Sequence, residues 1–400
     1  MSLLRIVFKS LRQHLLSTCI TAFSIALAAG LLMSVWVVRE QSRRSFTQMD
    51  SGFDAVVGIR SSQLQLVMNA IFHLENSPGN IEVEDYEKIK AEPGVALAVP
   101  IALGDNFKGY RIVGTIPEMF THNEYAPGKK YKTAEGRLFD PELREAVVGS
   151  FVAQKLNLKV GDEFEPYHGL DFDEDHAHDE TYVIVGVLEP SNTPADRLIW
   201  IPVEGLQFMS GHREESHEEL SAVLVKFRSP LAGKTLQMKY NQPDGHLTMA
   251  WPIGAIVAQL FDKISWFDRI LEMLAYLVAV VATGSILASI YNSMNERRRE
   301  IAIMRALGAR RSTIFSSVVL ESASIAAIGV VVGFSIYLLI TTTAAQFIRA
   351  QTGMVIDPME FHNVMLFGPI GIVLAAALAG VIPAMKAYNT DVAQNLVPVS

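Results

Sequence analysis

The stretch YHGLDFDEDHAHDETY, residues 167–182, holds the densest group of side chains that could do chemistry. Its imidazoles suit zinc, copper or nickel, and its carboxylates can complete a coordination shell. The candidate ligands are His168, Asp175, His176 and His178. A second acidic stretch, GHREESHEE at residues 211–219, adds His212 and His217. The pattern leads to the hypothesis of a zinc or other transition-metal site within residues 167–182.

Two interpretations of this stretch remain open. It could be a solvated acidic loop between strands, with exposed histidines, or it could bind a metal ion. On a strand, His176 and His178 would face the same side, because alternate side chains share a face, whereas on a loop the two rings could converge. Metal-linked export or sensing would follow only from a defined site.

Other catalytic and binding signatures are missing from the sequence. There is no GxxxxGKS or GxxxxGKT phosphate-binding loop, and GSF at residues 149–151 is not a GxSxG nucleophile elbow. We therefore expect no catalytic residue, no enzymatic activity and no nucleotide site in this chain. The net charge of −8 argues against nucleic acid as a main partner. The lone cysteine, Cys19, excludes an intramolecular disulfide.

Four long apolar runs divide the chain. A bilayer core about 30 Å thick needs roughly 20 helical residues, and every backbone group in lipid needs an internal hydrogen-bond partner. The runs therefore predict membrane-spanning helices. They are Leu15–Val38, Met273–Met294, Ser322–Ile348 and Val364–Met385. Gly329 and Gly333 form a GxxxG pattern in the third run, a spacing that permits close helix contact but also arises by chance.

Lysine and arginine near the ends of short loops predict the orientation of these spans. The N-terminal tail is basic, and the loop after the second run holds six arginines, so both are expected in the cytoplasm. The loop after the third run has Arg349 beside Asp357 and Glu360, and it fits the outer side. Residues of about 39–269 then lie outside the cytoplasm.

The large segment after the first run mixes short strands and helices, which predicts an α+β domain. Strands are expected at 54–59, 110–116, 181–189 and 222–227, a helix at 83–95, and a strand–helix–turn–strand unit at 144–164. Residues 117–140 are rich in proline, glycine and charge, and we expect them to join two lobes.

The segment NERRREIAIMRALGARRSTI, residues 295–314, is a basic helical pattern with an apolar face. Its glutamates come early and its arginines later, which suits the helix dipole. Gly308 suits the C′ position, where a positive φ ends a helix. Charge alone leaves two interpretations open, a basic anchor on the membrane surface or an element that docks in a groove of a partner.

Three segments resemble the FtsX/MacB family of ABC transporter permeases, also called type VII exporters. They are NERRREIAIMRALGARRSTIF, GRLFDPELREAVVGSFVAQKLNLKVGD and VIVGVLEPSNTPADRLIWIPVE. The layout of one span, a large outer domain and three further spans is also similar, and it covers almost the whole chain. The C-terminus departs from the family pattern, since Val392 stands where members often have proline.

The resemblance implies four transmembrane helices with an α+β extracytoplasmic domain inserted between helices 1 and 2. The expected order is a cytoplasmic tail (1–14), the first span (15–38), a stalk (39–52), the two-lobed MacB-like domain (53–252), a stalk (253–272), the second span (273–294), a coupling loop (295–313), the third span (314–348), an outer loop (349–363), the fourth span (364–385) and a cytoplasmic tail (386–400). A bacterial inner-membrane location, with both termini in the cytoplasm, follows.

The resemblance also implies that residues 295–313 form a coupling helix on a cytoplasmic ATPase. The matching residues are Glu296, Arg297, Arg299, Glu300, Ile301, Met304, Arg305, Leu307 and Gly308. ATP and magnesium would bind a partner ATPase dimer, and a second permease copy, membrane lipids and a periplasmic adaptor or hydrolase are further expected partners. Mechanotransmission that extrudes a hydrophobic, lipid, lipoprotein or peptide substrate is the first function implied. The alternatives are FtsX-like signalling to a cell-wall hydrolase and a metal-linked export component.

Overall fold

The computed structural model describes residues 3–47, 52–169, 177–210, 217–296, 298–352 and 355–388. The chain divides into two compact units. The first, which we call the helical unit, is formed by Met1–Ser42, Ser265–Phe347 and Ile356–Ser400. The second, the sheet unit, is formed by Arg43–Ile264 and Ile348–Val355.

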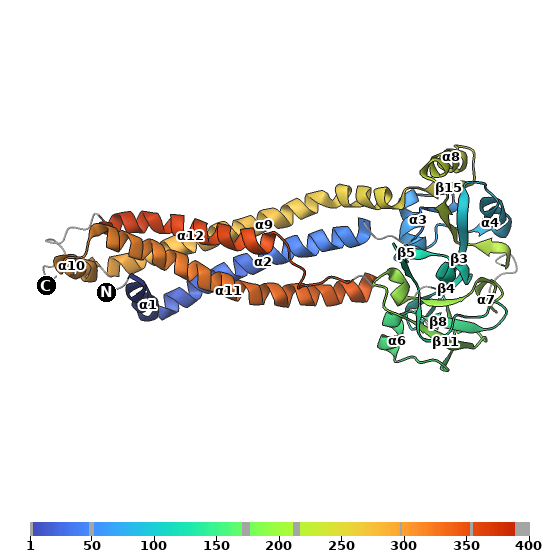
Figure 1. Ribbon diagram of the computed structural model, residues 1–400, viewed down its shortest axis with the longest axis horizontal. Helices are drawn as coiled ribbons and strands as arrows, with labels where there is room; N and C mark the ends of the chain where they lie inside the picture. The colour runs from blue at the N-terminus through green and yellow to red at the C-terminus, as the bar shows by residue number, and fades with distance from the viewer. Residues whose placement is uncertain are drawn as a thin grey trace. The chain divides into compact units, whose positions relative to one another are not determined.

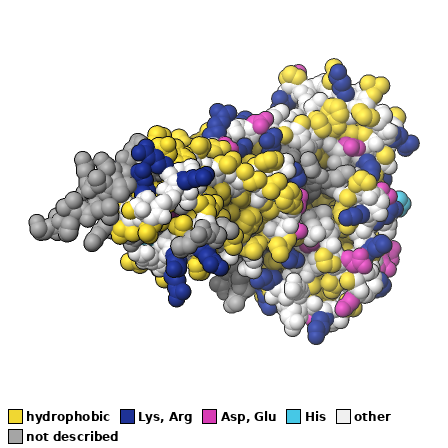
Figure 2. Space-filling view, turned by 60° about the vertical axis from the view of Figure 1, so that its left-hand side comes forward, with side chains coloured by type: hydrophobic (Ala, Val, Ile, Leu, Met, Phe, Trp, Pro, Cys, Tyr) yellow, Lys and Arg dark blue, Asp and Glu magenta, His cyan; other side chains and the backbone are white. Residues whose placement is uncertain are grey.

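The apolar runs form long helices (Figure 1). These are α2 (Leu15–Thr47), α9 (Ile253–Glu296), α11 (Arg311–Thr352) and α12 (Val364–Tyr388), with the short helices α1 (Leu3–Gln13) and α10 (Arg298–Ala306) beside them. Figure 2 shows hydrophobic side chains over much of the visible face of the long helices. Within the described part of the chain, three stretches are long and apolar enough to cross a membrane, namely Leu15–Ser45, Arg311–Thr352 and Val364–Lys386. The expected second span, residues 273–294, lies within α9.

The GxxxG glycines of α11 face α2 at backbone contact distance. A Cβ atom added at Gly329 would lie 2.7 Å from the carbonyl oxygen of Ala22, and one at Gly333 would lie 3.0 Å from the Cβ of Ala29. Small residues let two helix backbones approach closely. The structure therefore favours the close-contact interpretation of this pattern.

The sheet unit is built on a mixed sheet. Its main path runs β15 (Leu247–Ala250), β1 (Ala55–Ile59), β14 (Ala222–Phe227), β3 (Val95–Phe107), β4 (Tyr110–Thr115), β12 (Ile199–Pro202), β8 (Glu145–Val148), β11 (Tyr182–Leu188) and β7 (Thr133–Gly136). Off this path, β10 (Tyr167–His168) pairs with β3, and β9 (Glu163–Phe164) pairs with β11. Two small sheets pair β13 (Glu219–Leu220) with β2 (Ile81–Glu82) and β5 (Glu124–Ala126) with β6 (Lys129–Lys130).

Helices cover the sheet, and both of its faces are buried. The helices are α3 (Gln63–Ala70), α4 (Val83–Lys90), α5 (Glu118–Thr121), α6 (Ser150–Leu156), η2 (Pro194–Arg197), α7 (Val203–Gln207) and α8 (Pro230–Tyr240). In β1, Ala55 and Val57 belong to one apolar cluster and Val56 to another, because successive side chains point to opposite faces. The α+β class predicted for this segment is confirmed.

The four strands predicted for the sheet unit are confirmed. The strands expected at 54–59, 110–116, 181–189 and 222–227 correspond to β1, β4, β11 and β14. Residues 117–140, which were expected to join two lobes, contain α5, β5, β6 and β7, and β7 pairs with β11. The strand common to both parts of the sheet is β3, which pairs with β14 along its first half and with β4 along its second. The two sets of strands are therefore parts of one sheet that share β3.

The last turns of α11 belong to the sheet unit. The Arg197 guanidinium donates a hydrogen bond to the carbonyl oxygen of Gln351. The guanidinium of Arg349 lies 5.7 Å from the centre of the Phe151 ring, and that of Arg197 lies 5.9 Å from the same centre. Such cation–π contacts and hydrogen bonds fasten the end of α11 to α6 and η2.

Candidate coupling segment and histidine cluster

The helix expected to couple to an ATPase is α10, and it ends at a glycine turn. Gly308 has a φ of 95°, in the left-handed region that favours glycine. The Ala309 amide donates to the Met304 carbonyl and the Gly308 amide to the Arg305 carbonyl, each at 3.0 Å. This pair of bonds is a Schellman motif, which satisfies carbonyls that the helix end leaves open.

The apolar side chains of α10 point in two directions. Ile301 is buried, and the half-buried Met304 packs beside it against the core of the helical unit. Leu307 is 83% exposed and Ile303 is 42% exposed. With the exposed Ala306, they form an apolar face at helical spacing. The apolar face expected from the sequence is therefore divided between the core and the surface.

The basic side chains around α10 are described only in part. Arg297 lies outside the described residues, as do the side chains of Glu296, Arg299 and Glu300. Nearby, the guanidinium of Arg311 lies 5.5 Å from the centre of the Tyr388 ring. Lys386 Nζ lies 3.7 Å from the centre of the Tyr291 ring. The ends of α11 and α12 thus carry cations that lie over aromatic rings of α12 and α9.

An apolar groove lies between α2, α9 and α12 within the helical unit. It has a volume of about 790 Å³, and its lining includes Leu32, Trp36, Tyr276, Val280, Phe367 and Ile372. Arg39 and Glu272 also line it and form an ion pair at 3.8 Å. The groove therefore combines a wide apolar surface with one charged pair.

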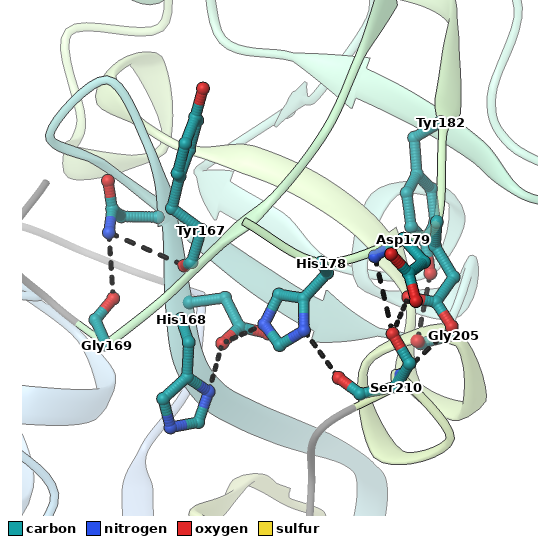
Figure 3. Close-up of polar contacts among 11 residues, drawn as sticks. Tyr167, His168, Gly169, His178, Asp179, Tyr182, Gly205 and Ser210 are labelled. Atoms are coloured by element: carbon teal, nitrogen blue, oxygen red, sulfur yellow. Dashed lines mark hydrogen bonds and ion pairs between the residues drawn. The ribbon is translucent and has the colours of Figure 1, made fainter. Parts of the chain in front are cut away.

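In the sheet unit, the pairing of β10 with β3 brings a histidine to a buried carboxylate. Asp105 and His168 are direct partners across these strands. His168 Nδ1 lies 3.4 Å from Asp105 Oδ1 (Figure 3). The Asp105 side chain is fully buried, whereas that of His168 is 55% exposed. The strand register, rather than the local sequence, thus decides which carboxylate His168 meets.

His178 reaches the same carboxylate from the other side of the loop. An isolated bridge between Tyr167 and Ala177 aligns the backbone, and the His178 amide donates to the Pro166 carbonyl at 2.9 Å. His178 Nε2 then lies 3.3 Å from Asp105 Oδ1. Burial alone would lower the pKa of His178, but the hydrogen bond and charge of Asp105 raise that pKa above its usual value.

Two further residues fix the His178 ring. Its Nδ1 lies 2.5 Å from the Ser210 carbonyl oxygen, which can only accept a hydrogen bond (Figure 3). The Ser210 amide and hydroxyl donate to the Glu180 carboxylate at 2.9 and 2.8 Å. Burial by itself would raise the pKa of Glu180, but these bonds lower it. Glu180 therefore holds Ser210, and Ser210 orients His178.

The structure brings together two of the four predicted ligands. His168, His178 and Asp105 each offer one ligand atom, and these atoms lie within 4.8 Å of one another. Asp175 and His176 lie outside the described residues. Sequence reasoning missed Asp105, although a charged residue inside an apolar strand was a usable signal. Of the second acidic stretch, His217 packs 4.5 Å from the centre of the Phe208 ring, and His212 lies outside the described residues.

Comparisons with known proteins match both units. The family model for the MacB-like periplasmic core domain matches residues 18–239, and the model for the FtsX-like permease C-terminal matches residues 272–392. The macrolide export ATP-binding/permease protein MacB of Bordetella avium (strain 197N) is 21% identical over 414 residues. That alignment covers 98% of this chain and 59% of the relative, so the chain spans about three fifths of the relative's length.

Two solved structures match part of this chain. The periplasmic region of MacB from Actinobacillus actinomycetemcomitans matches with a TM-score of 0.35 and 12% identity, over 53% of this chain and 94% of that one. The extracellular domain of the noncanonic ABC-type transporter YknZ from Gram-positive bacteria matches with a TM-score of 0.28 and 16% identity, over 48% of this chain and 97% of that one.

Apolar helices joined to an α+β domain define a membrane protein with a large domain outside the lipid. The match to the MacB-like periplasmic core domain covers more than half of the 400 residues, and the FtsX-like match covers the later helices. The chain belongs to the FtsX/MacB-like family of ABC transporter permeases.

Proposed function

We propose that this chain is the permease subunit of a complex that converts ATP hydrolysis by a separate cytoplasmic ATPase dimer into movement of the sheet unit. The observation that carries the proposal is the continuity of three helices. Helices α2, α9 and α11 each contribute residues to both units without a break. Because every turn of an α-helix is hydrogen-bonded to the next, a displacement at one end reaches the other. This is mechanotransmission.

The proposal includes four spans in the bacterial cytoplasmic membrane, with residues 273–294 of α9 as the second. Both termini and α10 lie in the cytoplasm, and the sheet unit lies outside. The six arginines between α9 and the start of α11 support this orientation. Single cysteines at positions 307 and 122, in a Cys19→Ser chain, test it. Labelling of both positions from the same side would contradict the proposal.

The ATPase docks on the exposed face of α10. Ile303, Ala306 and Leu307 supply apolar surface, and neighbouring arginines supply charge. ATP and magnesium bind the ATPase, and a second permease copy, identical or related, completes the complex. The apolar groove of about 790 Å³ supports a hydrophobic, lipid, lipoprotein or peptide cargo, taken from the outer leaflet or the periplasm.

The variant Leu307→Asp tests the docking face. Burial of a leucine side chain contributes about 1.5–3 kcal/mol, so we expect roughly 10- to 100-fold weaker binding of the ATPase. ATPase activity that co-purifies with the permease in mild detergent is the measurement. Leu143→Asp is the matched control, because Leu143 is also exposed but lies in the sheet unit. Equal co-purification of ATPase activity by the Leu307 and Leu143 variants would refute the docking assignment.

The double variant Arg197→Ala, Arg349→Ala tests the outer end of the same pathway. It removes the contacts that fasten the end of α11 to α6 and η2, so we expect normal ATPase recruitment with loss of export in cells. Lys234→Ala, an exposed position on α8, is the control. Full export by the double variant would contradict transmission through α11. Unchanged cargo levels in ATPase-null cells, together with ATP-dependent activation of a co-purifying hydrolase, would favour signalling instead.

A further inference from the structure

Asp105, His168 and His178 form an electron-rich cluster. The Ser210 carbonyl can only accept a hydrogen bond, so His178 Nδ1 carries a proton toward it. Nε2 lies 3.3 Å from Asp105 Oδ1, to which it donates when the ring is protonated; when the ring is neutral, Nε2 offers a lone pair to a cation instead. His168 Nδ1 faces the same oxygen at 3.4 Å. A cation placed among these three atoms could be bound by all of them, since each offers a ligand atom within 4.8 Å of the others.

We propose that Asp105, His168 and His178 bind one divalent transition-metal ion of the zinc class. Two imidazoles and a carboxylate form a ligand set that zinc accepts, with a water completing four-coordination. Zinc bonds to nitrogen and oxygen are about 2.0–2.2 Å, so the edges of its coordination tetrahedron are about 3.3–3.6 Å. The distances from Asp105 Oδ1 to His168 Nδ1 and His178 Nε2, 3.4 and 3.3 Å, match such edges.

The cluster is also built to hold its ligands in place. His178 receives the outer-shell support that metal-binding histidines usually have, since its second nitrogen donates to a backbone carbonyl that Glu180 secures through Ser210. Asn106, beside Asp105, donates through its amide to the Gly169 carbonyl at 3.0 Å and so holds the strand end that carries His168. The ion would tie β3, β10 and the segment that precedes β11 together.

Metal binding by the purified full-length chain in detergent tests the proposal. The affinity tag is removed, the protein is stripped with a chelator, and zinc is added at pH 7.5 against a competing chelator. We expect about one zinc per chain to remain after desalting, measured by elemental analysis. His168→Ala and His178→Ala are each expected to weaken zinc binding at least about tenfold to hundredfold, as the loss of a supporting group alone can do.

Three comparisons between variants test whether the zinc binds at Asp105, His168 and His178. His122→Ala removes an exposed histidine elsewhere in the sheet unit, and it is expected to bind zinc like the unaltered chain. Because His168 is largely exposed, its alanine variant should fold even if that of the buried His178 does not. The double variant Asp175→Ala, His176→Ala separates this site from the neighbouring acidic residues, and it is expected to retain the zinc.

Three results of these zinc-binding measurements would overturn the proposal. One is the absence of bound zinc in the unaltered chain at pH 7.5, which would leave a proton as the cation between Asp105 and His178. Another is unchanged zinc affinity in a folded His168→Ala chain. Loss of zinc only in the Asp175 and His176 double variant would also overturn it. None of these outcomes bears on ATPase recruitment through Leu307, so the two proposals fail separately.

Discussion

The contact between α11 and α2 makes a quantitative prediction for the variant Gly329→Ala. The added Cβ atom would lie 2.7 Å from the Ala22 carbonyl oxygen and 2.8 Å from the Ile25 Cβ atom. Real Cβ atoms essentially never approach other atoms below 3.0 Å, and the oxygen belongs to backbone. The helices must therefore separate by a few tenths of an ångström, which loosens every contact along the seam.

Overpacking of this kind typically costs about 1–3 kcal/mol. Replacing glycine by alanine also favours the helix by up to about 1 kcal/mol, and this gain must be separated from the clash. Gly371→Ala in α12 provides the control, because a Cβ atom there would meet nothing within 4 Å. The difference between the two variants then reports the clash alone.

The free energy of unfolding can be measured by titrating the purified chains with SDS and following far-ultraviolet circular dichroism. We expect Gly329→Ala to be less stable than Gly371→Ala by about 1–3 kcal/mol. Equal stability of the two variants would refute the reasoning, since it would mean that α11 does not touch α2 at Gly329. Export should fall with the Gly329 variant, because a loosened seam transmits less displacement.

Three further predictions concern single sites. Gly308→Ala should weaken stimulation of the ATPase, because alanine in the left-handed region costs about 1–2 kcal/mol. Gly308→Asn should weaken this stimulation less, because asparagine adopts that region more readily. Equal ATPase stimulation by the two variants would contradict the assigned turn. Burial, aided by the charge of Arg111, lowers the pKa of His73 to about 3. Below pH 6.5 the unfolded chain therefore binds a proton at this histidine that the folded chain excludes. The free energy of unfolding, measured by chemical denaturation, should then fall by about 2 kcal/mol between pH 7.5 and 5. A His73→Asn chain that shows the same fall would contradict the reasoning. The Arg137 hydrogen bonds lower the pKa of Glu145, so the Glu145 carboxylate stabilises the fold above pH 4.5 and loses that effect as the pH falls through the lowered pKa. In thermal melts, Arg137→Ala should therefore destabilise the chain at pH 7 but much less at pH 3. An equal loss of stability at both pH values would contradict this role of Arg137.

Sequence reasoning predicted most of the local structure but only part of the candidate sites. Strands such as β1 and β11 and the glycine turn at Gly308 have signals within a few residues, so they were predictable. The apolar pattern of α10 did not show that Ile301 faces the core while Leu307 faces outward. Both residues lie on an apolar stripe, and only the packing of neighbouring helices decides which part stays uncovered.

The sequence alone determined the apolar helices, the α+β class of the large domain, the turn after α10 and the family. These features depend on composition, periodicity and short motifs, all of which act between residues close along the chain. Only the tertiary structure placed Asp105 beside His168 and His178, 73 residues from the latter. That contact depends on the register of β10 against β3, which the packing of the whole sheet selects from many alternatives.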